Sequence, residues 1–349
     1  SRLLDMSLTA NLKKLLLRTT SYKGYGSGHL KRSILLANKI TGIYRNKVEV
    51  IIAIEGDKES FDIVKKSNIE YIELPIGIDL KEELKNYNQK NINIFILDVF
   101  DRNYICEKEY KNVADYLVTF SDMGEPSIYS DIVICSQLHP YSIKKSHDEQ
   151  IVLEGPNYFI FDNSYLSNVK KNKSFNEKRY SIFVCLGGYS NDTVLKVICS
   201  ALTSNINIFD NIIIITGYDC SIDIRTIIKK NGLNIEIIEY CDNPLKYLAK
   251  SDFAIISGGH IKYEAAALGV PSIIIGLVEH QDILSKIFEK TGSCIYLGTA
   301  DSVSPQKVLD GIDKLTSNDG RLNSMSKSAR DIVDGYGAER VVKAIFSLH

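Results

Sequence analysis

The stretch Gly24-Tyr-Gly-Ser-Gly-His-Leu-Lys-Arg32 decides the fold, because it joins a buried strand to an amphipathic helix through a glycine-rich loop. Before it, Leu15–Arg18 is a short apolar run typical of a buried strand, and after it apolar residues recur at helical spacing from Leu30 onward. Glycines in such a loop let backbone N–H groups approach a ligand closely, and the helix N-terminus behind them favours negative charge. The order strand, loop, helix therefore predicts an α/β unit with a ligand near Gly26 and Gly28.

The chemically distinctive residue of this loop is His29, which directly follows the last of three alternating glycines. The helix dipole disfavours a protonated imidazole at a helix N-terminus, so we expect His29 to be neutral at about pH 7 and able to accept a proton. That is the state that a general base needs. The same residues also fit a plain tight turn, in which His29 caps the helix or packs against the sheet edge.

Length and composition limit the classes of function that the chain can have. The chain has 349 residues, enough for two domains of ordinary size. With 42 Lys and Arg against 43 Asp and Glu, nothing in the charge balance favours nucleic acid as a partner. The seven cysteines form no CxxC pair and are typical of buried thiols in a reducing compartment. Because we find neither a membrane-spanning apolar run nor a signal peptide, we expect a cytoplasmic protein.

Short apolar runs alternate with helical periods along the chain, which predicts βαβ units and parallel sheets. Further strands are expected in the first half at Val48–Ile54, Ile69–Leu74, Ile92–Leu97, Tyr116–Phe120 and Asp131–Cys135. In the second half they are expected at Tyr180–Leu186, Asn211–Thr216, Ile235–Ile238, Phe253–Ile256 and Ser272–Ile275. The pair Asp98 and Asp101 and the polar loop 120–126 each follow a strand end, where open α/β sheets place ligand-contacting groups. A helix or turn cap is the alternative interpretation of Asp98.

The domain organisation follows from one polar, lysine-rich stretch at 163–178, which we interpret as a linker. It separates an N-terminal domain at 13–162 from a C-terminal domain at 179–334, in which glycine-opened turns recur. Residues 335–349 form a last helix that is a candidate to cross back to the first domain. Residues 1–12 are an N-terminal extension, a cloning remnant or the end of a preceding, fused domain. The predicted fold class is α/β, with two Rossmann-like domains facing each other across a cleft.

Four stretches carry a resemblance to a known family. They are Gly26-Ser-Gly-His-Leu-Lys-Arg32, Cys185-Leu-Gly-Gly188, Ser257-Gly-Gly-His-Ile-Lys-Tyr-Glu-Ala-Ala-Ala-Leu-Gly-Val-Pro271 and Glu279-His-Gln281. Together they look like the UDP-sugar hydrolases of pseudaminic acid biosynthesis and the related spore-coat polysaccharide proteins, which are similar to GT-B glycosyltransferases. The resemblance covers nearly the whole chain after Asn11. The first stretch points to the hydrolase branch, whereas the others are typical of the whole superfamily.

The resemblance implies roles for individual residues. His29 would activate the water that attacks the anomeric carbon, and Asp98 would orient His29 or the sugar. Helix N-termini would stabilise the UDP leaving group with neither a metal nor another cofactor, and Glu264 would accept from the ribose hydroxyls unless it is only a surface carboxylate. The residues expected at the nucleotide and diphosphate are Gly26, Gly28, Gly187, Gly188, Gly258, Gly259, His260 and Glu264. Those expected at the sugar are Arg18, Thr20, Lys31, Arg32, Tyr263, His280 and Gln281.

Two departures from the hydrolase pattern keep the reaction open. Arg18-Thr-Thr20 stands where the hydrolases have Arg-Ser-Asp, and Asp98-Val-Phe100 stands where they have Asp-His-Tyr, so one carboxylate and one phenol are missing. Three functions fit the remaining residues. The first is a hydrolase that releases UDP and a free 2,4-diacetamido-trideoxyhexose-type sugar. The second is a GT-B glycosyltransferase, and the third is a non-catalytic nucleotide-sugar-binding domain of a larger enzyme. In each case the expected partner is a nucleotide sugar, in the first case a UDP-sugar.

Overall fold

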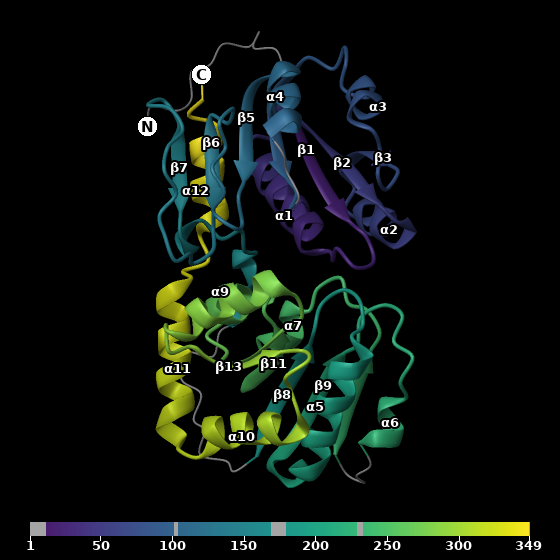
Figure 1. Cartoon of the computed structure of the whole chain (residues 1–349), viewed down its shortest axis with the longest axis vertical. Helices are drawn as coiled ribbons and strands as arrows, with labels where there is room; N and C mark the ends of the chain where they lie inside the picture. The colour runs from purple at the N-terminus through teal and green to yellow at the C-terminus, as the bar shows by residue number, and fades with distance from the viewer. Residues whose placement is uncertain (1–11, 101–103, 169–178, 229–232, 349) are drawn as a thin grey trace. The chain divides into compact units, whose positions relative to one another are not determined.

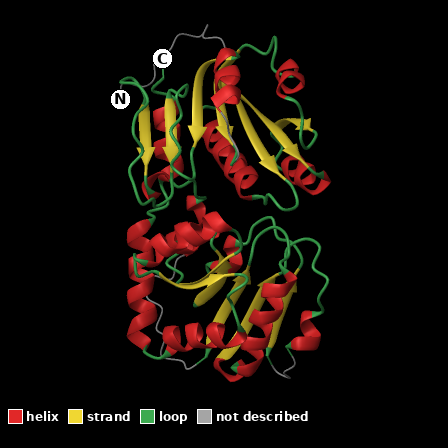
Figure 2. Cartoon of the chain, in the orientation of Figure 1, coloured by secondary structure: helices red, strands yellow, loops and turns green. Residues whose placement is uncertain are grey.

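The computed structural model describes residues 12–100, 104–168, 179–228 and 233–348. Most of the predicted N-terminal extension, Asp101 and residues 169–178 of the predicted linker lie outside this part of the chain. The chain forms two compact units, in each of which helices flank a parallel sheet (Figures 1 and 2). The first unit takes in the described residues of Ser1–Ser136, Tyr141–Ile160 and Gly337–His349, and the second takes in Gln137–Pro140 and Phe161–Tyr336.

The first unit contains a seven-stranded sheet with the order β3-β2-β1-β4-β5-β6-β7, and all neighbouring strands are parallel. The strands are β1 (Lys13–Ser21), β2 (Val48–Gly56), β3 (Glu70–Leu74), β4 (Ile92–Asp98), β5 (Ala114–Phe120), β6 (Ile132–Cys135) and β7 (Ile151–Glu154). The helices are α1 (Gly28–Ile43), α2 (Lys58–Lys66), α3 (Leu80–Lys85), α4 (Tyr104–Asn112) and α12 (Gly337–Ile345), with a 3-10 turn η1 (Pro156–Tyr158). The strand order reverses between β1 and β4.

The second unit contains a six-stranded sheet with the order β10-β9-β8-β11-β12-β13, again with parallel neighbours. The strands are β8 (Tyr180–Cys185), β9 (Phe209–Ile215), β10 (Asn234–Ile238), β11 (Phe253–Ser257), β12 (Ser272–Gly276) and β13 (Cys294–Thr299). The helices are α5 (Asp192–Ser204), α6 (Ile224–Ile227), α7 (Leu245–Leu248), α8 (Ile261–Ala267), α9 (Glu279–Glu289), α10 (Pro305–Thr316) and α11 (Asp319–Ile332), with 3-10 turns η2 (Asn163–Asn168) and η3 (Ile206–Ile208). This is the strand order of the Rossmann fold, so the predicted class is confirmed.

Two strands, β7 and β13, were not predicted from the sequence. Each lies at the edge of its sheet, where one side of the strand has no neighbouring strand to bury it. β7 has only four residues and β13 is buried only in its first two, so neither gives the long apolar run of the central strands. Edge strands are short and half-buried for this reason, and their sequences resemble loops.

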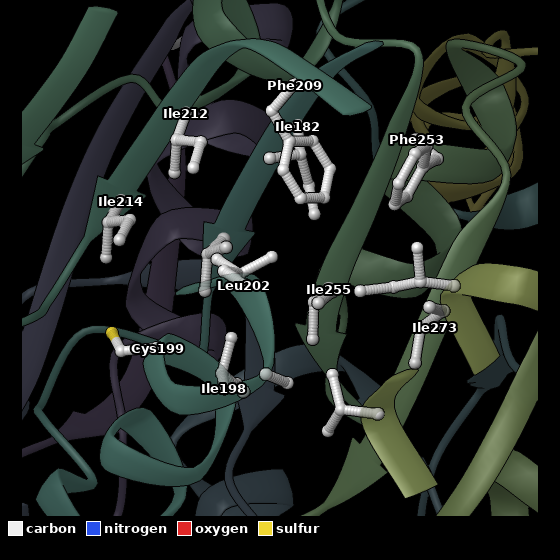
Figure 3. Close-up of a cluster of buried hydrophobic side chains, with 14 of the residues drawn as sticks. Ile182, Ile198, Cys199, Leu202, Phe209, Ile212, Ile214, Phe253, Ile255 and Ile273 are labelled. Atoms are coloured by element: carbon white, nitrogen blue, oxygen red, sulfur yellow. The ribbon is translucent and has the colours of Figure 1, made fainter. Parts of the chain in front are cut away.

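The core of the second unit fixes the strands whose ends carry the glycine turns. Figure 3 shows Ile182 of β8, Ile212 and Ile214 of β9 and Ile255 of β11, all buried on one face of the sheet. Residues two apart on a strand share a face, which explains the spacing of the two β9 isoleucines. Leu202 of α5 packs against the same face. The apolar contacts therefore hold the strand ends in register.

The last helix belongs to the first unit. α12, yellow in Figure 1, packs on α1, where Tyr44 stacks on Phe346 with ring centroids 3.9 Å apart. Lys39 of α1 forms an ion pair with Glu339 of α12. The first residue of α12, Gly337, has no room for a side chain, because a Cβ there would come within 2.2 Å of the Phe159 carbonyl oxygen. Among the described residues, no helix is both long and apolar enough to cross a bilayer.

Candidate functional site

Both sheets reverse their strand order at one point, and some of the residues singled out from the sequence follow the carboxyl ends of the strands there. In the first unit the reversal lies between β1 and β4, which lead to the glycine loop with His29 and to Asp98. In the second it lies between β8 and β11, which lead to Gly187 and Gly258. Ligands of open α/β sheets bind at such switch points.

The glycine loop delivers His29 to the first turn of α1. Gly24 and Gly26 have φ of +90° and +95°, a conformation that residues with a side chain rarely adopt. The Tyr22 carbonyl accepts hydrogen bonds from the N–H groups of Tyr25 and Gly26, which closes the turn. The Tyr25 ring lies 5.6 Å from the imidazole, and its hydroxyl accepts the Phe100 N–H. These contacts fix the loop that leads to the histidine.

The imidazole lies against a buried carboxylate. His29 Nδ1 is 2.7 Å from Asp98 Oδ1, and the Asp98 side chain is 1% exposed. Arg32, one helical turn after His29, donates from Nε to Asp98 Oδ2 at 2.8 Å. It also donates from its two terminal nitrogens to Asp122 at 2.8 and 3.0 Å. His29, Arg32, Asp98 and Asp122 form a contiguous buried cluster, which we call the His29 set.

The charges within the His29 set determine which imidazole nitrogen carries the proton. Burial alone would raise the pKa of Asp98, but the positive charge of Arg32 and hydrogen bonds from Arg32 and His29 outweigh it and lower that pKa. Asp98 is therefore a carboxylate, which only accepts hydrogen bonds. Nδ1 must then carry the proton that Asp98 accepts, although Arg32 Nη2 also lies 3.1 Å from it. The lone pair of the neutral imidazole is on Nε2.

Three residues that were expected to contact the sugar have other partners. Arg32 is buried and directed at two carboxylates. Arg18 donates all five of its N–H groups to protein acceptors, namely the Thr19 carbonyl, the Thr20 hydroxyl, Glu55 and, twice, Glu83. The Thr20 hydroxyl is buried as the acceptor of that bond. Arg18 and Thr20 therefore fit the role of holding the end of β1. Lys31 is half-buried on α1.

In the second unit, the loop after β8 leads into α5. Gly187 has φ +136°, and the Gly188 carbonyl accepts the Tyr218 N–H at 2.9 Å. Asn191 caps α5 by accepting the Val194 N–H. Asp192 accepts hydrogen bonds from Ser190 and Ser221, which lower its pKa to about 2. The glycine loop and the helix N-terminus thus lie next to each other, as an anion site requires.

The turn Gly258-Gly259-His260 lies against the start of α9. A Cβ on Gly258 would be 2.5 Å from Ser285 Oγ and 2.9 Å from Gln281 Cβ, whereas the nearest atom to a Cβ on Gly259 is Gln281 Nε2 at 3.6 Å. The Gln281 amide oxygen accepts the Leu277 N–H at 3.0 Å, which fixes the side chain in this place. The structure therefore brings Gly258 and Gly259, which were expected at the diphosphate, next to Gln281, which was expected at the sugar. His260, Glu264 and His280 are half-buried around the same turns.

Gly258→Ala should destabilise the second unit, because the methyl group must displace α9. We expect the free energy of unfolding to fall by about 1–3 kcal/mol, the usual cost of overpacking. Gly259→Ala is the matched control, since its methyl group meets only ordinary contact distances. Denaturant unfolding of both variants measures the difference. Equal stability of the two would contradict the packing of α9 on Gly258.

The burial and the partners of two neighbouring residues of α8 were not predicted from the sequence. Tyr263, expected at the sugar, is fully buried, and its hydroxyl accepts the Leu138 N–H at 2.8 Å. That expectation was wrong because the ring packs edge-on against Phe288 in the core. Lys262, which had no assigned role, is also fully buried and donates from Nζ to the Gly258 carbonyl at 2.5 Å. Its positive charge therefore lies directly behind the turn.

In a comparison with protein families, one family model matches a region close to the second unit. The family model described as the glycosyltransferase family 28 C-terminal domain matches residues 181–341. The spore coat polysaccharide biosynthesis protein SpsG of Bacillus subtilis is 24% identical over 333 residues, covering 93% of this chain and 95% of that protein. The UDP-2,4-diacetamido-2,4,6-trideoxy-beta-L-altropyranose hydrolase of Campylobacter jejuni is 23% identical over 290 residues, covering 80% and 97%.

A solved structure shows the fold. The crystal structure of MurG from Acinetobacter baumannii superposes with a TM-score of 0.70 at 13% identity, covering 96% of this chain and 100% of MurG. The fold is GT-B. The chain is thus related to GT-B proteins of polysaccharide biosynthesis, and the family 28 match lies almost wholly in its second unit. The described residues hold no group of three His, Cys, Asp or Glu side chains arranged to bind a metal ion.

Proposed function

We propose that this chain is a nucleotide-sugar hydrolase that releases UDP and a free 2,4-diacetamido-trideoxyhexose-type sugar, in nonulosonate or surface polysaccharide biosynthesis. The observation that carries the proposal is the contact of His29 Nδ1 with an ionised, buried Asp98 at the switch point of the first sheet. This contact leaves the imidazole lone pair on Nε2, which is the state of a general base. The hydrolase relative, similar over 80% of the chain, supports the substrate class.

In the proposed reaction, water attacks the anomeric carbon while His29 Nε2 takes its proton. The bond between that carbon and the diphosphate oxygen breaks, and UDP leaves with the electron pair. The turns at Gly187-Gly188 and Gly258-Gly259-His260 would bind the diphosphate through backbone N–H groups, and Glu264 would accept from the ribose. Gln281, held beside Gly258, would contact the sugar or the diphosphate. The reaction needs no cofactor.

A GT-B glycosyltransferase is the second candidate, because a glycosyltransferase family model matches most of the second unit. His29 would then take the proton of an acceptor hydroxyl in place of water. The residues of the His29 set suit either reaction, since both need one base at the anomeric carbon.

Phosphorus NMR in oxygen-18 water, with a UDP-2,4-diacetamido-trideoxyhexose and no acceptor, separates the candidates. We expect release of UDP that carries no oxygen-18, because the label enters the sugar when water attacks carbon. Labelled UDP would mean attack at phosphorus and would overturn the mechanism. If the protein binds UDP tightly but does not cleave UDP from the sugar nucleotide, the result would instead favour a transferase or a binding domain.

A further inference from the structure

Asp122 is the one member of the His29 set that the sequence analysis did not single out. It lies in the loop directly after β5, and its side chain is 8% exposed. Both of its carboxylate oxygens accept hydrogen bonds from Arg32, at 2.8 and 3.0 Å. Oδ2 is also 3.9 Å from His29 Nδ1. Asp122 is therefore close enough to influence the charge of the imidazole without being its direct hydrogen-bond partner.

The guanidinium of Arg32 is held between two carboxylates. One edge of its planar fork faces Asp98 and the other faces Asp122, and the fork lies over the Phe120 ring at 4.3 Å from its centroid. Such a bidentate arrangement on both edges fixes the plane of the group. The charges of Asp122 and Asp98 also raise the pKa of Arg32 against the effect of burial, so Arg32 stays charged. The geometry leaves one cation between two anions.

The charge balance depends on Asp122. Two carboxylates and one guanidinium give the set a net charge of −1 when His29 is neutral and zero when His29 carries a proton. Without Asp122, Arg32 would neutralise Asp98, and an imidazolium would lie 3.1 Å from the guanidinium with no excess negative charge among the described residues of the set. In a buried cluster such an imbalance is strongly unfavourable.

We propose that Asp122 is a positioning residue that offsets the charge of Arg32, so that the negative charge of Asp98 remains available to the imidazolium formed when His29 accepts a proton. The role in catalysis rests on the proposed function, but the effect on the imidazole does not. Within the part of the chain that the structure describes, His29 faces Arg32 from its own helix, Asp98 from the end of β4, Asp122 from the loop after β5, and Tyr25 from the glycine loop.

The test is Asp122→Asn, which keeps the shape of the side chain and removes its charge. Nitrogen-15 NMR of the histidine rings, with the His29 signal assigned from a His29→Gln variant, follows its protonation without substrate. We expect His29 to take up its proton at lower pH, with about tenfold less imidazolium at a given pH. If the enzyme hydrolyses the UDP-sugar, kcat should fall to a similar extent with little change in KM. Asp122→Glu, which keeps the charge, should restore both.

Glu125→Gln is the matched control, because it removes one negative charge from the same loop at an exposed position. It should leave the His29 titration unchanged. The double variant Arg32→Gln, Asp122→Asn removes both members of the offset pair, so its His29 should titrate like that of the wild type. An unchanged titration in Asp122→Asn, or a double variant that behaves like the single one, would overturn the proposal. A shifted titration in a protein that does not hydrolyse the sugar would refute only the proposed function.

Discussion

Replacing His29 with alanine should lower the rate of UDP-sugar hydrolysis by about 10²–10⁴-fold, the usual contribution of a general base. The affinity for UDP should stay the same, because the proposed nucleotide site is built from the turns of the second unit. The expected loss is large because Asp98 and Arg32 hold the imidazole in one tautomer at one position. A water molecule in its place would have neither the basicity nor the fixed direction. Single-turnover kinetics and calorimetric titration with UDP measure the two quantities separately.

The matched control is His147→Ala in the same unit. His147 is exposed and contacts the Ser130 carbonyl through Nε2 at 3.2 Å. Its replacement should leave turnover within about twofold of the wild type, as expected for a surface change without a special role. If His29→Ala keeps full turnover while UDP affinity is unchanged, His29 is not the base. A parallel loss of UDP affinity would mean that the variant disturbs more than proton transfer.

The sequence predicted the fold better than it predicted the partners of single side chains. The alternation of apolar runs with helical periods predicts both parallel sheets, because buried central strands need continuous apolar sequence. It also places Asp98 and the loop 120–126 at the same edge as His29, since the carboxyl ends of parallel strands share one edge. The pairing of Arg32 with Asp98 and Asp122 joins residues 66 and 90 positions apart. No local pattern records such a contact.

Burial accounts for the partners of two residues that were expected at the sugar. Arg18 follows an apolar strand and precedes two threonines, a pattern that fits a ligand contact at a strand end. Its neighbours in space, Glu55 and Glu83, lie on β2 and α3, and only the folded chain shows that they surround it. Tyr263 has the polar tip of a ligand-binding residue, but α8 turns it into the core. In both cases the direction of one side chain decides the role, and spacing along the chain does not determine it.

Glu83→Ala should lower the free energy of unfolding by about 3–5 kcal/mol, because it leaves a buried guanidinium with too few acceptors. Glu83 is 2% exposed and accepts hydrogen bonds from Arg18 at 2.8 and 3.1 Å. The hydroxyls of Tyr87 and Tyr110 donate to the same carboxylate at 2.7 and 2.9 Å. Burial and the charge of Glu83 raise the pKa of Tyr110 against the opposing effect of Arg18, so that tyrosine remains a donor.

Glu82→Ala is the control on the same helix, since Glu82 forms only a surface ion pair with Lys85 and is 61% exposed. Such pairs contribute about 0–1 kcal/mol, so denaturant unfolding should separate the two variants clearly. Equal stability would mean that Arg18 finds other acceptors when Glu83 is lost. Two arginines are buried in the described part of this unit, and their surroundings differ. Arg18 donates its N–H groups to acceptors from β1, β2 and α3 and so links these elements, whereas Arg32 divides its N–H groups between Asp98 and Asp122 and lies beside the imidazole.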